Sequence, residues 1–166
     1  MKIIFLDMDN TIAENKTCDN VDFTPGLYSC KRPIQIVIDA ITTLYPDVPK
    51  VILSKAQGGK QGQEEKIQWL AEHFPGTFID FIFLNEGEKY YMKGVYADQW
   101  CQRHDIDNSE ALVIDDSKQV LQYCKAYNLQ TQYPQQVICD YESYIKSMDM
   151  GVSKSLGRNN WEIGWN

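Results

Sequence analysis

The sequence contains no apolar run long enough to cross a membrane. Its longest apolar stretches have the length of a strand, whereas a membrane helix needs roughly 20 apolar residues. The N-terminal stretch MKIIFLDMDN carries one lysine and a short apolar run that ends in acidic residues. This pattern is typical of a first strand and not of an export signal, so we expect a cytoplasmic protein that does not bind membranes.

An excess of basic residues is also missing. The chain has 16 Lys and Arg residues against 23 Asp and Glu residues, a net charge of −7 and a pI of about 4.8. Nucleic-acid-binding proteins usually carry a basic patch or stripe, and none is visible here. Nucleic acid is therefore not the expected partner, although a local site in an acidic protein can still bind a small phosphate ester.

Cysteine and histidine patterns that bind metals are absent as well. The five cysteines are scattered without a CxxC pair, and their odd number favours reduced thiols. A bridge between Cys18 and Cys30 is the less favoured alternative. The two histidines, His73 and His104, show no catalytic spacing.

What the sequence does contain is an alternation of apolar and amphipathic segments over 166 residues, a length that fits one domain. Strands are expected at Lys2–Leu6, Val51–Leu53, Phe78–Leu84, Ala111–Ile114 and, more weakly, Leu129–Gln132. Helices are expected at Pro33–Leu44, Gln63–Phe74, Gly94–His104, Ser117–Tyr127 and Tyr141–Met148. The alternation predicts an α/β fold with a doubly wound, Rossmann-like parallel sheet of about five strands and helices on both faces.

Two segments do not fit this core. Residues 15–31 form a long loop or flap, and residues 151–166 resemble a tail whose Trp161 and Trp165 pack on the body or on a partner. We therefore expect one core over residues 1–150 followed by the tail. In the loop after the second strand, Lys55 and Lys60 either bind an anion or are solvated.

Polar residues gather where the predicted strands end. In parallel sheets the ligand lies at the carboxyl ends of the strands. Each residue alone has a simpler interpretation: the aspartates fit turns and helix caps, Ser54 fits a loop serine and Lys93 a surface lysine. Several carboxylates at one edge, however, repel one another unless a cation neutralises them. Carboxylate oxygens suit Mg²⁺, and a lysine with nearby hydroxyls suits a phosphoryl group. These candidate residues are Asp7, Asp9, Thr11, Ser54, Lys93, Asp115 and Asp116.

The same residues resemble the motifs of the haloacid-dehalogenase-like hydrolase superfamily over about residues 1–130. DMDNT at Asp7–Thr11 is similar to the first motif, DxDx(T/V), and Ser54 in VILS to the second. Lys93 is similar to the third motif, with Lys89 as a weaker choice, and the acidic pair in LVIDDS to the fourth.

The resemblance implies a Mg²⁺-dependent phosphomonoester hydrolase that acts through an aspartyl-phosphate. Asp7 would be the nucleophile and a metal ligand, and Asp9 the general acid/base, with its carbonyl on the metal. Thr11, Ser54 and Lys93 would lie on the phosphate-binding side, with Thr11 also supporting the loop. Asp115 and Asp116 would complete the metal site; which of them binds directly is left open.

The resemblance also bears on architecture and substrate. Asn10 stands where most phosphatases of this superfamily have glycine, and Asn tolerates a positive φ. The short spacing between motifs implies no separate cap domain. A nucleotide monophosphate is the first expected substrate, because the first-motif region loosely resembles deoxyribonucleotidase-like members.

Other substrates and functions stay open from the sequence. A sugar phosphate or a phosphoprotein, and thus a phosphorylated macromolecule, are the alternative substrates. Alternative functions are a receiver-like phospho-acceptor domain, whose motif order is the reverse, and a non-catalytic phosphate-binding protein. The oligomeric state is not determined by the sequence.

Overall fold

The structure, a computed structural model, describes the backbone of residues 1–14 and 23–156 and the side chains of these ranges as far as Asp149. The expectations that concern Cys18, Trp161 and Trp165 lie outside the described residues. In the part of the chain that the structure describes, no helix is both long and apolar enough to span a bilayer.

A single sheet of five parallel strands organises the chain, in the order β3-β2-β1-β4-β5. The first strand is central: Phe5 lies opposite Val51 on one neighbour and Val113 on the other. All of its residues are buried, as expected for a continuous apolar strand covered on both faces. The strands are β1 (Ile3–Leu6), β2 (Lys50–Lys55), β3 (Asp80–Leu84), β4 (Ala111–Ile114) and β5 (Gln130–Gln132).

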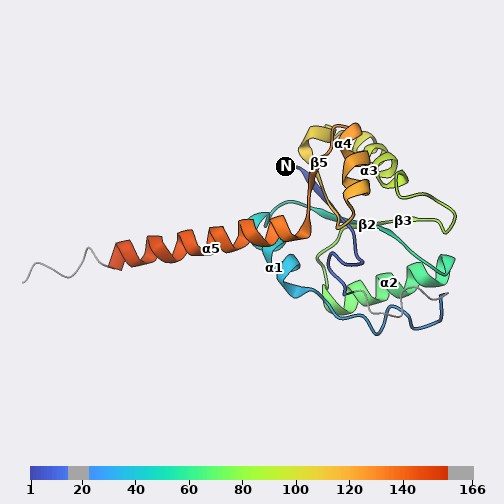
Figure 1. The fold of residues 1–166 in the computed structure, drawn as a ribbon, viewed down its shortest axis with the longest axis horizontal. Coiled ribbons are helices and arrows are strands. Elements are labelled where there is room, and N and C mark those ends of the chain that lie inside the picture. The colour runs from blue at the N-terminus through green and yellow to red at the C-terminus, as the bar shows by residue number, and fades with distance from the viewer. Residues whose placement is uncertain (15–22, 157–166) are drawn as a thin grey trace, which may run out of the picture.

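Helices cover both faces of this sheet (Figure 1). Successive β1 residues point to opposite faces: Ile4 and Leu6 join the core under α1, α2 and α5, while Ile3 and Phe5 join the core under α3 and α4. The expected doubly wound fold is therefore confirmed. The helices are α1 (Gln35–Leu44), α2 (Gly59–His73), α3 (Met92–Arg103), α4 (Lys118–Ala126) and α5 (Pro134–Leu156), with a short 3-10 helix at Asn108–Glu110.

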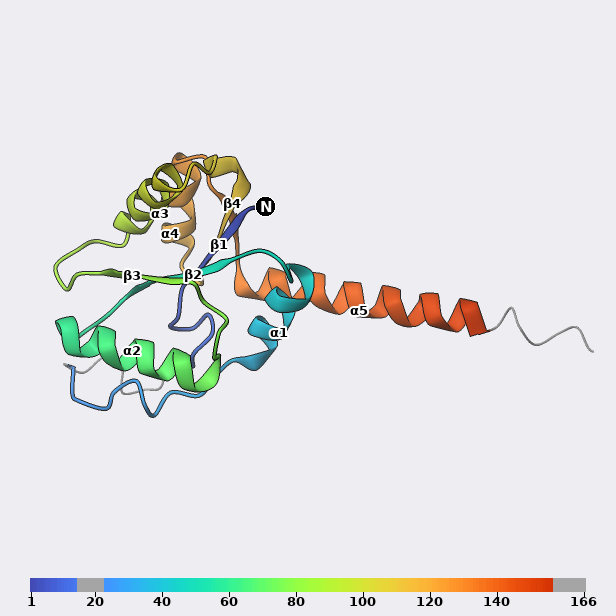
Figure 2. The same cartoon turned by 180° about the vertical axis from the view of Figure 1, so that it is seen from behind.

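Some element bounds differ from the expected ones. β2 extends past Leu53 because Ser54 and Lys55 pair with β3. α2 begins at Gly59 instead of Gln63. α5 begins at Pro134, a residue suited to a first helical turn, and it continues to Leu156. Figure 2 shows the second half of α5 extending away from the body.

Main-chain hydrogen bonds join the segment after β1 to the segment before α1: the Glu14 N–H donates to the Arg32 carbonyl (2.8 Å) and the Ile34 N–H to the Ile12 carbonyl (2.8 Å). Within residues 1–14 and 23–156, no second domain is inserted between the motifs, in agreement with the expected absence of a cap.

Residues 23–31 lie against α2 and are called here the wall segment. The Gly26 N–H donates to Glu65 Oε1 (2.8 Å), and Trp69 Nε1 donates to the Lys31 carbonyl (3.0 Å). At Gly58, φ is +78°, and an added Cβ would lie 2.3 Å from the Phe23 ring. Glycine is therefore needed there both for its conformation and for the close approach of the segment.

Candidate active site

The loop after β1 turns sharply and brings both of its aspartates to the carboxyl edge of the sheet. The Asp7 N–H still donates to the Ile114 carbonyl (2.9 Å), whereas the Met8 carbonyl accepts from the N–H groups of Ile12 and Ala13 at 2.9 Å each. Asn10 adopts a φ of +58° at this turn. This is the left-handed region, which asparagine tolerates better than most residues.

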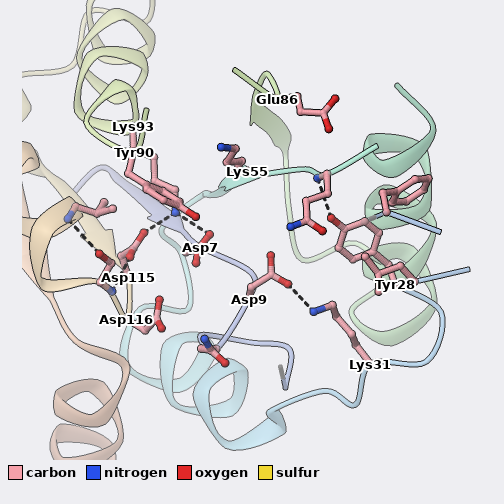
Figure 3. Close-up of a pocket in the computed structure, with 16 residues that line it drawn as sticks. Asp7, Asp9, Tyr28, Lys31, Lys55, Glu86, Tyr90, Lys93, Asp115 and Asp116 are labelled. Atoms are coloured by element: carbon pink, nitrogen blue, oxygen red, sulfur yellow. Dashed lines mark hydrogen bonds and ion pairs between the residues drawn. The ribbon is translucent and has the colours of Figure 1, made fainter. Parts of the chain in front are cut away.

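Lys93, in the first turn of α3, forms ion pairs with the aspartates that follow β1 and β4. Its Nζ lies 2.8 Å from Asp7 Oδ1 and 2.6 Å from Asp115 Oδ2, and all three side chains are buried (Figure 3). Burial alone would lower the pKa of Lys93, but the two carboxylates outweigh it and raise the pKa above its ordinary value. Lys93 therefore stays charged beside Asp7.

Three carboxylates of this edge are placed to share a cation. Asp7, Asp115 and Asp116 each offer an oxygen, and these oxygens lie within 4.8 Å of one another. Burial, followed by the charge of Asp7, raises the pKa of both Asp115 and Asp116, although Lys93 acts in the opposite direction. Burial and the charge of Asp7 thus disfavour the ionised forms of Asp115 and Asp116, an effect that a bound cation would offset, and the hard oxygen donors of the cluster fit Mg²⁺.

The acidic pair also takes part in a helix cap, which was the simpler interpretation of this stretch. Asp115 Oδ1 accepts a hydrogen bond from the Ser117 N–H (2.8 Å), and Ser117 Oγ accepts from the Val120 N–H (3.4 Å) at the start of α4. The cap and the ion pair use different oxygens of Asp115, so the two interpretations are compatible.

Asp9 lies on the other side of Asp7, between two further lysines. Its Oδ2 is 2.6 Å from Lys66 Nζ and its Oδ1 is 2.9 Å from Lys31 Nζ. Burial on its own would raise the pKa of Asp9, but the charges of Lys66 and Lys31 together outweigh it, so the pKa is lowered. Asp9 is therefore ionised in this arrangement.

Lys66, on α2, is a site residue that the sequence did not predict. It is fully buried, and its Nζ donates to Asp9 Oδ2 (2.6 Å), to Ser54 Oγ (2.8 Å) and to the Lys55 carbonyl (2.7 Å). Burial lowers the pKa of Lys66, whereas Asp9 and Asp7 oppose this effect. The three acceptors match the three N–H groups of an ammonium.

Lys66 stands on the buried face of α2. Trp69 and Leu70 are buried together with Lys66, whereas Ile67, the next residue along the chain, is 38% exposed. Lys66 precedes Trp69 by three residues and Leu70 by four, so it stands on their face of the helix. A lysine inside an apolar helix face was the available signal.

The two hydroxyl residues lie deeper than the carboxylates. Ser54 and Thr11 are both fully buried, and neither lines the cleft described below. Ser54 contacts Lys66, whereas Thr11 Oγ1 has no hydrogen-bond partner among the described residues. A direct contact of either hydroxyl with a phosphoryl group stays a prediction.

A cleft of about 750 Å³ opens above these charges. In Figure 3, Asp7 and Asp9 lie between the side that carries Lys93 and Asp115 and the side that carries Lys31 and Tyr28. Lys55 lines the cleft, whereas Lys60 is exposed beside Glu64. The lining residues are Asp7, Asp9, Asn10, Phe23, Leu27, Tyr28, Lys31, Lys55, Gln57, Glu86, Tyr90, Lys93, Asp115, Asp116, Ser117 and Val120.

Comparisons with known proteins find similarity at the level of structure. No protein-family model and no curated protein sequence matches the chain. A haloacid dehalogenase-like family hydrolase from Xanthomonas campestris is similar with a TM-score of 0.61 at 10% identity, over 93% of this chain and 94% of that one. The D,D-heptose 1,7-bisphosphate phosphatase from B. bronchiseptica, solved with magnesium and phosphate, has a TM-score of 0.57 at 20% identity, over 79% of each chain.

A third similar structure is a haloacid-dehalogenase family enzyme from Bacteroides thetaiotaomicron, solved with magnesium and inorganic phosphate. Its TM-score is 0.56 at 12% identity, over 80% of this chain and 93% of that one. These similarities show that the chain has the fold of the haloacid-dehalogenase-like hydrolases. Because fold alone does not define an activity, the function has to be argued from the site.

Proposed function

We propose that this chain is a haloacid-dehalogenase-type phosphatase, a Mg²⁺-dependent phosphomonoester hydrolase with Asp7 as its nucleophile. One observation carries the proposal: Asp7 belongs at once to the Lys93 ion pair and to the group of three carboxylates that fits a cation. Asp9 lies in the same cleft, on the side away from Lys93. The magnesium and phosphate in two structures of the same fold agree with this assignment.

The residues divide the chemistry as follows. An Asp7 carboxylate oxygen attacks phosphorus, and the bond between phosphorus and the leaving oxygen breaks. The electron pair of that bond stays on the leaving oxygen, which takes a proton from Asp9. Water then attacks the aspartyl-phosphate, Asp9 takes up a proton from the water, and the bond from phosphorus to Asp7 breaks to release phosphate. Asp9 thus serves as acid first and as base second.

Asp9 needs a proton for the first step, although its two lysines keep it ionised in the free site. A bound phosphoryl group brings negative charge next to Asp9, and this charge favours protonation of Asp9.

Asp7, Asp115 and Asp116 would hold the Mg²⁺, with the Asp9 carbonyl as a further ligand. The ion would supply positive charge that offsets the charge of the phosphoryl oxygens during transfer. Lys93 stabilises the same oxygens from its place beside Asp7.

The proposed substrate is a nucleotide monophosphate. Aromatic rings line the cleft on both sides of the reacting groups, Phe23 and Tyr28 from the wall segment and Tyr90 from the loop before α3. Such rings can stack on a base, and the cleft has no cap domain above it in the described residues. Sugar phosphates and phosphopeptides are the competing substrates that a screen has to include.

Phosphate release from nucleotides, sugar phosphates and phosphopeptides, with and without Mg²⁺, tests this proposal. We expect sustained, Mg²⁺-dependent turnover that favours nucleotides, and a loss on the order of 10³-fold or more in Asp7→Asn. A receiver-like domain would give one phosphorylation without turnover, and a binding protein would give neither. Activity that survives in Asp7→Asn would show that the nucleophile is assigned wrongly.

A further inference from the structure

Lys31 is a buried cation that belongs to none of the motifs. It is the last residue of the wall segment, its side chain is 3% exposed, and its Nζ lies 2.9 Å from Asp9 Oδ1. Lys66 occupies the other oxygen of the same carboxylate, at 2.6 Å. Each oxygen of Asp9 therefore has an ammonium of its own, and the two come from different parts of the chain.

The backbone of Lys31 is fixed as firmly as its side chain. Its carbonyl accepts a buried hydrogen bond from Trp69 Nε1 (3.0 Å), and its N–H donates to the Tyr28 carbonyl (3.1 Å). Its Nζ also lies 5.7 Å from the centroid of the Tyr28 ring. Because burying an ammonium is costly without a partner, this arrangement holds Lys31 beside Asp9 and not in solvent.

We propose that Lys31 is a positioning residue. It holds the Asp9 carboxylate in the orientation in which it faces the leaving group, and it links Asp9 to the wall segment, which contacts the same group. This inference rests on the proposed function, because it concerns how Asp9 performs its part. Phe23, Leu27 and Tyr28 line the cleft on the same segment. The wall segment would thus contact the leaving group and, through Lys31, also hold Asp9, which gives that group its proton.

The physical reason lies in the freedom of an aspartate side chain. Rotation about the terminal torsion of aspartate is only weakly restricted, so a carboxylate held at one oxygen can still turn about that contact. Lys31 holds the second oxygen and removes this freedom. Proton transfer requires hydrogen-bond reach to the leaving oxygen, so the loss of this anchor should slow the step that protonates it.

The test compares two substrates that differ in their need for a proton. p-Nitrophenyl phosphate releases a phenolate that departs with little protonation, whereas β-glycerophosphate releases an alkoxide that needs a proton. The ratio kcat/KM reports the steps up to the departure of the leaving group, and it is therefore the quantity to measure. The variants are Lys31→Met and Lys31→Arg, with Lys60→Met as control because Lys60 is 88% exposed on the surface.

In Lys31→Met we expect kcat/KM to fall about 10-fold further for β-glycerophosphate than for p-nitrophenyl phosphate. In Lys31→Arg we expect much of that difference to disappear, and in Lys60→Met we expect no difference. Equal losses on both substrates in Lys31→Met would mean that Lys31 only supports the fold, and would overturn the proposal. A wild-type protein that releases phosphate neither from these two substrates nor from nucleotides would instead refute the proposed function.

A second measurement does not depend on turnover. Calorimetric titration with inorganic phosphate in the presence of Mg²⁺ should give Lys31→Met a Kd within about twofold of the wild-type value, because a positioning residue acts through Asp9. A loss of phosphate affinity on the order of 10-fold would make Lys31 a phosphate ligand and would also overturn the proposal.

Discussion

Replacing Lys66 by methionine tests the buried charge cluster most directly. Methionine keeps most of the side-chain volume and removes only the ammonium, so the packing of α2 against the sheet changes little. The change leaves Asp9 Oδ2, Ser54 Oγ and the Lys55 carbonyl without the donor that serves all three.

The magnitude follows from the burial of these groups. Removing one partner of a buried ion pair costs about 3–5 kcal/mol, because the other charge remains in a poorly solvated place. Asp9 retains Lys31 and its side chain is 28% exposed, so we expect the lower end, about 3 kcal/mol. For a domain of this size, such a loss lowers the Tm by about 6–12 °C.

The loss should depend on pH in a defined direction. Burial would raise the pKa of Asp9, but Lys66 and Lys31 lower it below its ordinary value of 3.8. A carboxyl whose folded-state pKa is lowered stabilises the fold above pH 3.8 and loses this contribution as the pH falls through the folded-state pKa. The stability difference between wild type and Lys66→Met should therefore be largest near neutral pH and shrink in acid.

Urea unfolding at a series of pH values measures this difference. Lys60→Met is the matched control, because Lys60 lies in the first turn of the same helix with its side chain 88% exposed. We expect that control to stay within about 0.5 kcal/mol of wild type. A Lys66→Met protein as stable as wild type at neutral pH would refute the reasoning that the buried pair is needed.

Two further predictions follow from the metal ligands and from the wall segment. Saturating Mg²⁺ should stabilise the protein by about 2.7 kcal/mol at 100 times its Kd, and this gain, measured by thermal unfolding, should be lost in Asp115→Asn combined with Asp116→Asn. An equal gain in that double variant would contradict the proposed site. Gly58→Ala should lower stability by about 1–3 kcal/mol and weaken substrate binding, because its Cβ would lie 2.3 Å from the Phe23 ring at a φ of +78°. Unchanged KM and unfolding midpoint would refute that explanation.

The apolar pattern and the order of the motifs made most of the fold predictable. Continuous apolar strands such as Ile3–Leu6 indicate a parallel sheet, and the carboxyl ends of such strands meet at one edge. For that reason Asp7, Asp9, Asp115 and Asp116 could be expected to lie together, and the third motif added Lys93; the structure brings all five to one cleft. The first and last residues of the strands and helices were predicted less well, because strand pairing and helix starts depend on contacts with segments that are distant in the sequence.

Lys66 and Lys31 show what the sequence by itself did not determine. Their distances from Asp9 along the chain are 57 and 22 residues. The local pattern marks Lys66 only as a lysine on an apolar helix face, and it gives no signal for Lys31. Only the packing of α2 and of the wall segment against the sheet places both ammonium groups on the same carboxylate. The sequence thus determined which residue types gather at the edge of the sheet, whereas the tertiary structure decided which charges are buried together, because burial and pairing depend on contacts between distant segments.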